Sequence, residues 1–126
     1  MRNALAGFIL ALSTLFLPPV AAHAAQPFNT AAFQDAQKAG KTVLLHVTAP
    51  WCSTCRAQHP IVSGLEKSRP QLVVYNINFD SSKDLLRQLK VQSQSTLIVF
   101  KGAKEVGRSI GDTKAASIDA LVAKGL

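Results

Sequence analysis

The chain contains two cysteines, Cys52 and Cys55, separated by two residues in the stretch APWCSTCRAQHP (49–60). A pair this close can be a disulfide staple, part of a metal site or a redox couple. A staple across so short a loop constrains little of the unfolded chain, so its entropic gain is small. The spacing therefore favours metal binding or thiol chemistry.

Metal and haem binding need further residues near the pair. A zinc site with four protein ligands needs two more, and the histidines after residue 24 are His46 and His59. His59 follows Cys55 by about one helical turn, so a metal cluster stays an alternative. Covalent haem attachment needs histidine directly after the second cysteine, where this chain has Arg56. We expect redox chemistry, with no metal and no other cofactor.

The predicted elements around the pair assign a role to each thiol. A buried strand is predicted over 41–49, and the pattern becomes helical from Cys52 to about Arg69. Free N–H groups and the helix dipole stabilise an anion at a helix N-terminus. Cys52 is therefore expected to have a lowered thiol pKa and to attack a substrate disulfide. Cys55, nearly one turn further and deeper, is expected to resolve the mixed disulfide.

The rest of the chain alternates between helical and strand patterns. Helices are predicted from Asn29 or Thr30 to Gly40, from Cys52 to about Arg69, from Asp80 past Leu89 and over 114–124, and strands over 41–49, 71–79, 96–102 and 104–110. Pro60 is expected to kink the second helix, because proline lacks an N–H and clashes with the preceding turn. This order predicts an α/β fold in which a central mixed β-sheet is flanked by helices on both faces.

The first 24 residues have the pattern of a secretory signal peptide. One charge, Arg2, precedes the apolar run Ala4–Leu17, and Ala22-His23-Ala24 has the small residues of a cleavage site. The run is shorter than the roughly 20 residues that span a bilayer as a helix, although an uncleaved anchor stays an alternative. We expect cleavage after Ala24, a single domain over 25–126 and a periplasmic location without stable membrane insertion.

Charge indicates no nucleic-acid partner. The chain has 14 basic and 7 acidic side chains, a formal net charge of +7 at pH 7. The basic residues are scattered, and the few aromatic residues do not alternate with them. A surface that binds nucleic acid should instead show a basic cluster or a row of stacking rings.

The sequence resembles the thioredoxin family. The resemblance rests on Trp51-Cys52-x-x-Cys55 after a buried strand, on Pro60 five residues beyond the second cysteine, and on a final strand–strand–helix unit. It covers about residues 30–126, with the family's usual first strand short or absent. It implies a thioredoxin-like fold, a thiol–disulfide oxidoreductase, protein or peptide disulfide substrates and a thiol electron donor. Trp51 is expected to border the site and exclude water, with core packing as the alternative.

Two features near the cysteines differ from the family pattern, His46 and the pair Ser53-Thr54. His46 occupies a strand position at which many relatives have a buried acid that accepts a proton. It is either an acceptor for the Cys55 proton near neutral pH or a hydrogen-bonded core histidine. Ser53 and Thr54 lack the histidine that strongly oxidising relatives often carry between the cysteines. A reductant or a mild exchanger is therefore expected.

Ser95 is the third departure, because it occupies the position of the family's cis-proline. Gln94 and Ser95 then take the positions that bind an extended substrate in relatives. A cis bond without proline costs about 2.5–4 kcal/mol, so the Gln94–Ser95 bond is expected to be trans. No extra dimerisation domain is recognised, so we expect a monomer. A metal or iron–sulfur binding module and a non-catalytic interaction domain of the same fold remain alternatives.

Overall fold

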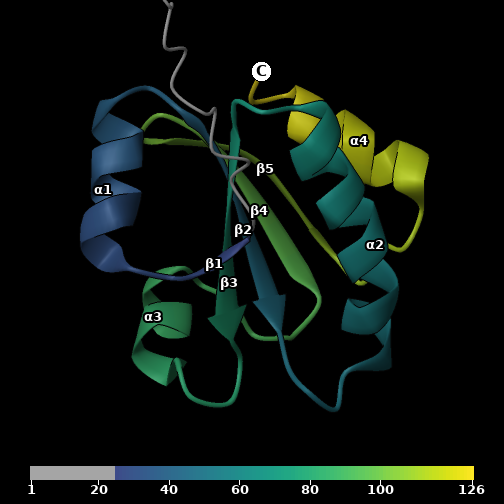
Figure 1. The fold of residues 1–126 in the computed structure, drawn as a ribbon. Coiled ribbons are helices and arrows are strands. Elements are labelled where there is room, and N and C mark those ends of the chain that lie inside the picture. The colour runs from purple at the N-terminus through teal and green to yellow at the C-terminus, as the bar shows by residue number, and fades with distance from the viewer. Residues whose placement is uncertain (1–24) are drawn as a thin grey trace, which may run out of the picture.

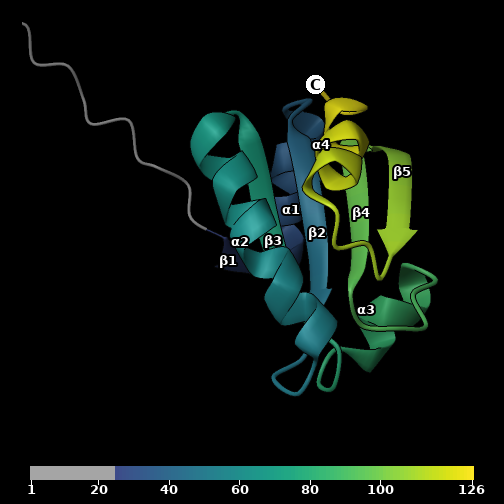
Figure 2. The same cartoon turned by 90° about the vertical axis from the view of Figure 1, so that its right-hand side faces the viewer.

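The computed structural model describes residues 25–126, which form a five-stranded sheet between two layers of helices (Figures 1 and 2). The elements in chain order are β1 (Gln26–Pro27), α1 (Thr30–Lys38), β2 (Thr42–Thr48), α2 (Ser53–Ser68), β3 (Leu72–Asn78), α3 (Lys83–Gln88), β4 (Thr96–Lys101), β5 (Lys104–Ile110) and α4 (Ala115–Ala123). The predicted α/β fold is confirmed, with the short strand β1 added in front. The predicted signal segment, 1–24, lies outside the described residues.

The sheet is mixed, with strand order β1-β3-β2-β4-β5. β1 and β2 both pair parallel to β3, whereas β4 is antiparallel to β2 and to β5. β2 therefore lies in the middle, paired on both edges and buried along nearly its whole length. The cysteine pair follows the end of β2. Its position is therefore set by the most enclosed strand of the sheet.

Side-chain alternation along β2 divides the interior into two cores. Val43, Leu45 and Val47 pack with residues of α1 and α3, whereas Leu44 packs with residues of α2 and α4. Figure 1 shows the same division, with α1 and α3 on one side of the sheet and α2 and α4 on the other. His46 has the parity of Leu44, so its side chain lies on the face covered by α2.

The boundaries of the helices follow local signals in the sequence. Asn29 caps α1, and its Oδ1 accepts the N–H of Ala32 at 2.9 Å. Gly40, with φ of 69°, follows the helix and lets the chain turn back into β2. α2 continues through Pro60, whose ring is exposed. The kink expected there stays a prediction.

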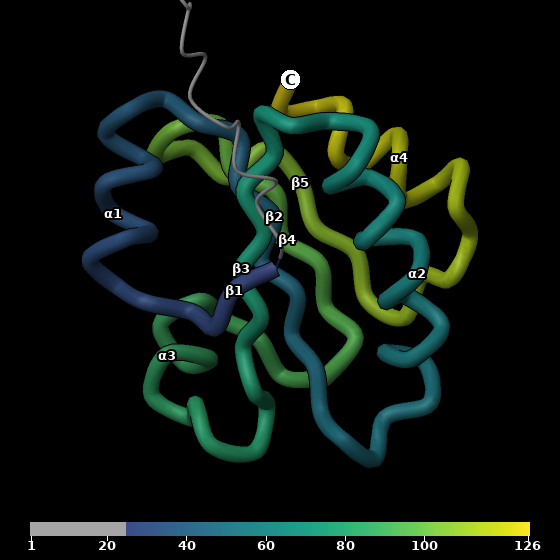
Figure 3. Tube along the Cα trace, viewed as in Figure 1, coloured from purple at the N-terminus to yellow at the C-terminus, as the bar shows by residue number. Residues whose placement is uncertain are grey.

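The Cα trace in Figure 3 shows the turn from β2 into α2 and the loop from α3 to β4 at the same end of the molecule. The hairpin turn between β4 and β5 lies at Gly102 and Ala103, as predicted. Within residues 25–126, no helix combines the length and the apolar character needed to span a membrane.

Candidate active site

The two cysteines form a disulfide at the start of α2. Cys52 is the N-cap residue of the helix, and its Sγ accepts the backbone N–H of Cys55 at 3.1 Å. An N–H that points at this sulfur, together with the helix dipole, stabilises negative charge on it. The geometry thus supports Cys52 as the thiol that ionises first.

Depth below the surface does not separate the two cysteines. Cys52 is 3% and Cys55 1% exposed, and both pack with Ala49 and the partly buried Phe79. The Cys55 Sγ also lies 3.8 Å from the Val47 carbonyl oxygen at the end of β2. Cys55 is the deeper residue, as expected, by only this small difference in exposure, and the cap position is what distinguishes Cys52.

Trp51 lies on the surface next to the disulfide. Its side chain is 57% exposed, and its indole N–H donates to the Asp80 carboxylate at 2.9 Å. The ring meets Phe79 edge to face at 6.4 Å, and the Lys83 ammonium lies 4.0 Å from the centre of the Phe79 ring. Core packing of Trp51 is therefore wrong as a prediction. The tryptophan forms part of an aromatic and charged rim beside the cysteines.

Ser95 contacts both sulfur atoms. Its Oγ lies 3.4 Å from Cys52 Sγ and 3.6 Å from Cys55 Sγ, and the residue is 4% exposed. Its N–H donates to the Val47 carbonyl at 2.9 Å, and its φ of 61° is left-handed. The Gln94–Ser95 bond is trans, as expected, because no cis peptide occurs among residues 25–126. Gln94 is half-buried beside it.

Gln58 is a site residue that the sequence analysis missed. It is fully buried on α2, and its Oε1 accepts a hydrogen bond from His46 Nε2 at 2.9 Å. Its Nε2 donates to the backbone carbonyls of Ser95, at 3.1 Å, and of Asp112, at 2.9 Å. One signal was available, because Gln58 follows Cys55 by three residues and therefore lies on the same helix face.

The bond to Gln58 also assigns the tautomer of His46. An amide oxygen only accepts, so Nε2 carries the imidazole proton and Nδ1 holds the lone pair. Nδ1 is buried, without a hydrogen-bond partner in the described part of the chain. Burial lowers the pKa of His46 to about 4; the bond to Gln58 opposes this shift, and the nearby His59 adds to it.

With that pKa, His46 is neutral and a weak base near pH 7. The structure therefore favours the hydrogen-bonded core histidine over an acceptor of the Cys55 proton near neutral pH. The physical reason is that burial removes the water that would stabilise an imidazolium ion.

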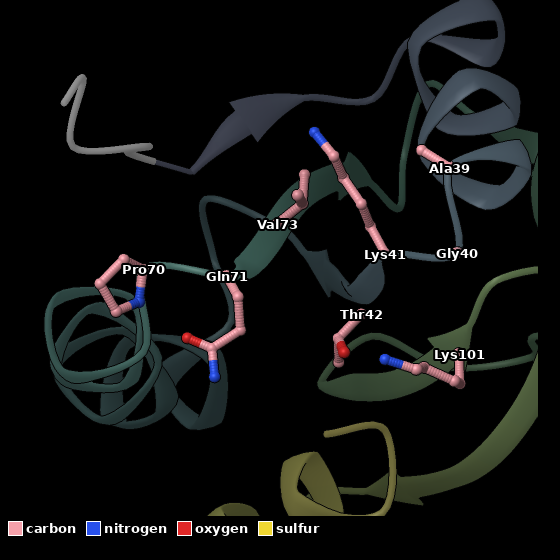
Figure 4. A pocket seen from close by; sticks show the side chains of 8 residues that line it. All are labelled: Ala39, Gly40, Lys41, Thr42, Pro70, Gln71, Val73 and Lys101. Carbon is pink, nitrogen blue, oxygen red and sulfur yellow. The ribbon is translucent and has the colours of Figure 1, made fainter. Parts of the chain in front are cut away.

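A possible metal site and a surface pocket were the other candidates for a functional site. Residues 25–126 contain no group of three or more His, Cys, Asp or Glu side chains placed to hold a metal ion. Figure 4 shows a pocket of about 250 Å³ where β2 and β3 begin, lined by Lys41, Thr42, Gln71 and Lys101 among others. Because the cysteines follow the far end of β2, this pocket plays no part in their chemistry.

Comparison with known proteins places the chain among relatives. The family model described as Thioredoxin matches residues 24–124. A thioredoxin H-type from Fagopyrum esculentum is 34% identical over 95 residues, which cover 75% of this chain and 81% of the relative. A thioredoxin from Chlamydia trachomatis serovar D is 35% identical over 92 residues, covering 73% and 89%. The crystal structure of Trxlp from Edwardsiella tarda EIB202 has 37% identity and a TM-score of 0.75, covering 79% of this chain and 98% of that one.

Proposed function

The chain belongs to the thioredoxin family as a thiol–disulfide oxidoreductase with a Cys52–Cys55 disulfide, and from this premise we propose that it reduces or exchanges disulfides of exported proteins or peptides. The observation that carries the proposal is the position of Cys52 at the N-cap of α2, where its sulfur accepts the Cys55 N–H. The Cys55 sulfur is bonded to that of Cys52, so Cys52 attacks the substrate and Cys55 resolves the mixed disulfide.

The reaction is a two-step exchange. The Cys52 thiolate attacks one sulfur of a substrate disulfide, forms a mixed disulfide and expels the second substrate sulfur as a thiolate. Cys55 then loses its proton and attacks Cys52 Sγ, which closes the Cys52–Cys55 disulfide and releases the remaining substrate sulfur. Two electrons pass to the substrate. The two protons lost by Cys52 and Cys55 are matched by two taken up by the substrate thiolates.

The direction of the reaction is part of the proposal. Ser53 and Thr54 between the cysteines supply no cation that would stabilise the reduced pair strongly. This composition supports a reductant or a mild exchanger, kept reduced by a thiol electron donor. The reduction potential of the Cys52–Cys55 couple tests the direction, since a potential as high as that of a strong oxidase would reverse it.

Reduction of insulin by the dithiol-charged protein tests the activity itself. The native protein should precipitate insulin chains, and Cys52→Ala should abolish the reaction. Cys55→Ala should accumulate mixed disulfides with substrate, because the resolving step is missing. Mixed disulfides formed by Cys52→Ala and not by Cys55→Ala would reverse the two roles. Metal analysis of the same samples tests the binding-module alternative, for which stoichiometric metal is the expected result.

The proposed location is the periplasm, after cleavage behind Ala24. The support is the pattern of residues 1–24, with Arg2, the apolar run and the small residues of a cleavage site. Mass spectrometry of the exported protein should find Ala25 at the N-terminus. A chain that keeps residues 1–24 and sediments with membranes would support the uncleaved anchor. Light scattering on the cleaved protein tests the proposed monomer.

A further inference from the structure

Among residues 25–126, the hydroxyl of Ser95 is the side-chain donor that reaches the reacting sulfurs. It lies 3.4 Å from Cys52 Sγ and 3.6 Å from Cys55 Sγ, inside the range for hydrogen bonds to sulfur. The loop between α3 and β4 supplies it from a position 43 residues beyond Cys52. Because Ser95 is 4% exposed, the hydroxyl faces the sulfurs with little competition from water.

The backbone holds this hydroxyl in place. The Ser95 N–H donates to the Val47 carbonyl, and the Ser95 carbonyl accepts from Gly111 N–H at 3.0 Å and from Gln58 Nε2 at 3.1 Å. These bonds tie one residue to β2, to α2 and to the loop after β5. A left-handed residue that is held on three sides presents its side chain in one direction.

We propose that Ser95 is a catalytic residue whose hydroxyl donates a hydrogen bond to the Cys52 thiolate in the reduced protein. A hydroxyl has one proton to give and lone pairs to receive another. In the reduced pair Ser95 therefore donates to the Cys52 thiolate while it accepts the S–H of Cys55, which also has the Val47 carbonyl within reach. One side chain satisfies both sulfurs in their different protonation states.

This arrangement stabilises the reduced pair. A hydrogen bond to a charged group is stronger than one to a neutral sulfur, so Ser95 favours the thiolate over both the thiol and the disulfide. The bond weakens as charge moves from Cys52 to the leaving sulfur of the substrate. The inference rests on the proposed function, because a donor to Cys52 serves catalysis only if that sulfur attacks as a thiolate.

The test compares Ser95→Ala and Ser95→Gly with the native protein. Both substitutions remove the hydroxyl, and glycine also suits the left-handed backbone, so Ser95→Gly is expected to fold. Ser93→Ala is the control, since it removes from the same loop a hydroxyl that bonds the Gln94 carbonyl. The readout is the pH profile of iodoacetamide labelling, with Cys52 assigned by peptide mass spectrometry.

Both Ser95 variants should raise the apparent pKa of Cys52 by about one, so that at lower pH about tenfold less of Cys52 is thiolate and labelling is slower. At a pH above the Cys52 pKa of the native protein and of the variants, the reduction potential of each Ser95 variant should fall by about 30 mV, the equivalent of a tenfold change. Ser93→Ala should match the native protein. The charged and titratable groups of the neighbouring elements, Arg56, Asp80 and His46, are unchanged in all variants.

An unchanged Cys52 pKa in Ser95→Gly overturns the proposal, as does an equal rise in Ser93→Ala. A rise in Ser95→Ala alone would assign the effect to backbone strain and would also overturn it. The titration uses no disulfide substrate. If the native protein fails to reduce insulin while both Ser95 variants raise the Cys52 pKa, the proposed function fails and the hydrogen bond stands.

Discussion

His46 shows how burial by a neighbouring helix decides the chemistry of one residue. In the sequence it is a histidine at the strand position where many relatives have a buried acid that accepts a proton. In the structure its Nε2 is committed to Gln58 and its pKa is lowered to about 4 by burial. Its place beneath α2 therefore makes it a neutral core residue, and the pH dependence of folding should reveal this.

The stability of the protein should fall as the pH drops from about 6.5 towards 4. The folded protein holds His46 neutral, whereas the unfolded chain protonates it near pH 6.5, so its contribution is fully present only above that pH. The difference between the folded and unfolded pKa values of His46 corresponds to a loss of about 3 kcal/mol in the free energy of unfolding. Urea unfolding of the oxidised native protein and of His46→Gln, from pH 7.5 to 4, measures it.

Comparison with His46→Gln separates the effect of His46 on stability from the effect of the carboxylates. The pKa values of Glu105 and Asp112 are also lowered, by hydrogen bonds to Arg108 and to Ser117, so both destabilise the protein in acid. These groups are retained in His46→Gln, which should lose about 3 kcal/mol less than the native protein over the same range. Parallel pH profiles for the two proteins would show that His46 titrates normally in the fold.

At the scale of elements, Gln58 joins α2 to β2 and to two loops through one amide. Replacing it with leucine keeps most of the volume and removes all three hydrogen bonds. The His46 N–H and the Asp112 carbonyl would lose their hydrogen bonds to Gln58, and an unsatisfied buried group costs about 1–3 kcal/mol. We expect Gln58→Leu to lower the free energy of unfolding by about 2–5 kcal/mol, measured by urea denaturation.

Gln34→Leu is the matched control, because Gln34 lies on the exposed face of α1. It should change the stability by no more than about 0.5 kcal/mol. If Gln58→Leu changed the stability equally little, water would be satisfying the groups that Gln58 now bonds. The amide would then not be what connects these elements.

The loop before β4 should reject the proline that the family has at position 95. Proline fixes φ near −65° and has no N–H, whereas Ser95 has φ of 61° and donates to Val47. We expect Ser95→Pro to lower the free energy of unfolding by about 3 kcal/mol or more. Ser95→Gly keeps the N–H and suits this φ, so it should stay within about 1 kcal/mol of the native protein. Native-like stability of Ser95→Pro would mean that the loop has a second conformation.

The elements were largely predictable, and the contacts between them were not. Hydrophobic periodicity located the four helices and all strands except β1, which is too short for a periodic signal. Cys52 and Cys55 were recognisable because their chemistry depends on spacing along one helix. The roles of His46 and Ser95 were not, since Gln58 reaches His46 from another element and Ser95 meets the sulfurs only through its loop conformation.

At the scale of the whole molecule, the C-terminus is fixed to the central strand. The Thr42 hydroxyl donates to the Gly125 carbonyl, which joins positions 83 residues apart. A Cβ at Gly125 would come within 2.7 Å of Thr42 Cγ2 and 2.9 Å of Val99 Cγ1. Glycine is therefore needed for the end of the chain to pack against β2 and β4.

Gly125→Ala should lower the free energy of unfolding by about 1–3 kcal/mol, the usual cost of overpacking a core. Gly64→Ala is the matched substitution, because Gly64 lies on the open side of α2 with no atom within 4 Å of the added Cβ. It should raise stability by about 0.5–1 kcal/mol, since alanine favours a helix. Thermal and urea unfolding of both variants checks the opposite signs, and equal effects would show that the C-terminal contact is not tight.

The hydrogen bonds of Gln58 also limit which substitutions this sequence can accept during evolution. Gln58 bonds the His46 ring and the backbone carbonyl of Ser95, so replacing His46 or Gln58 alone leaves a buried group without a partner. A proline at 95 cannot keep the φ of 61° and would move that carbonyl away from the amide. Selection against such intermediates should make lineages keep all three residues or exchange them together. In an alignment of relatives, positions 46, 58 and 95 should therefore covary, and a proline at 95 should occur with other residues at 46 and 58.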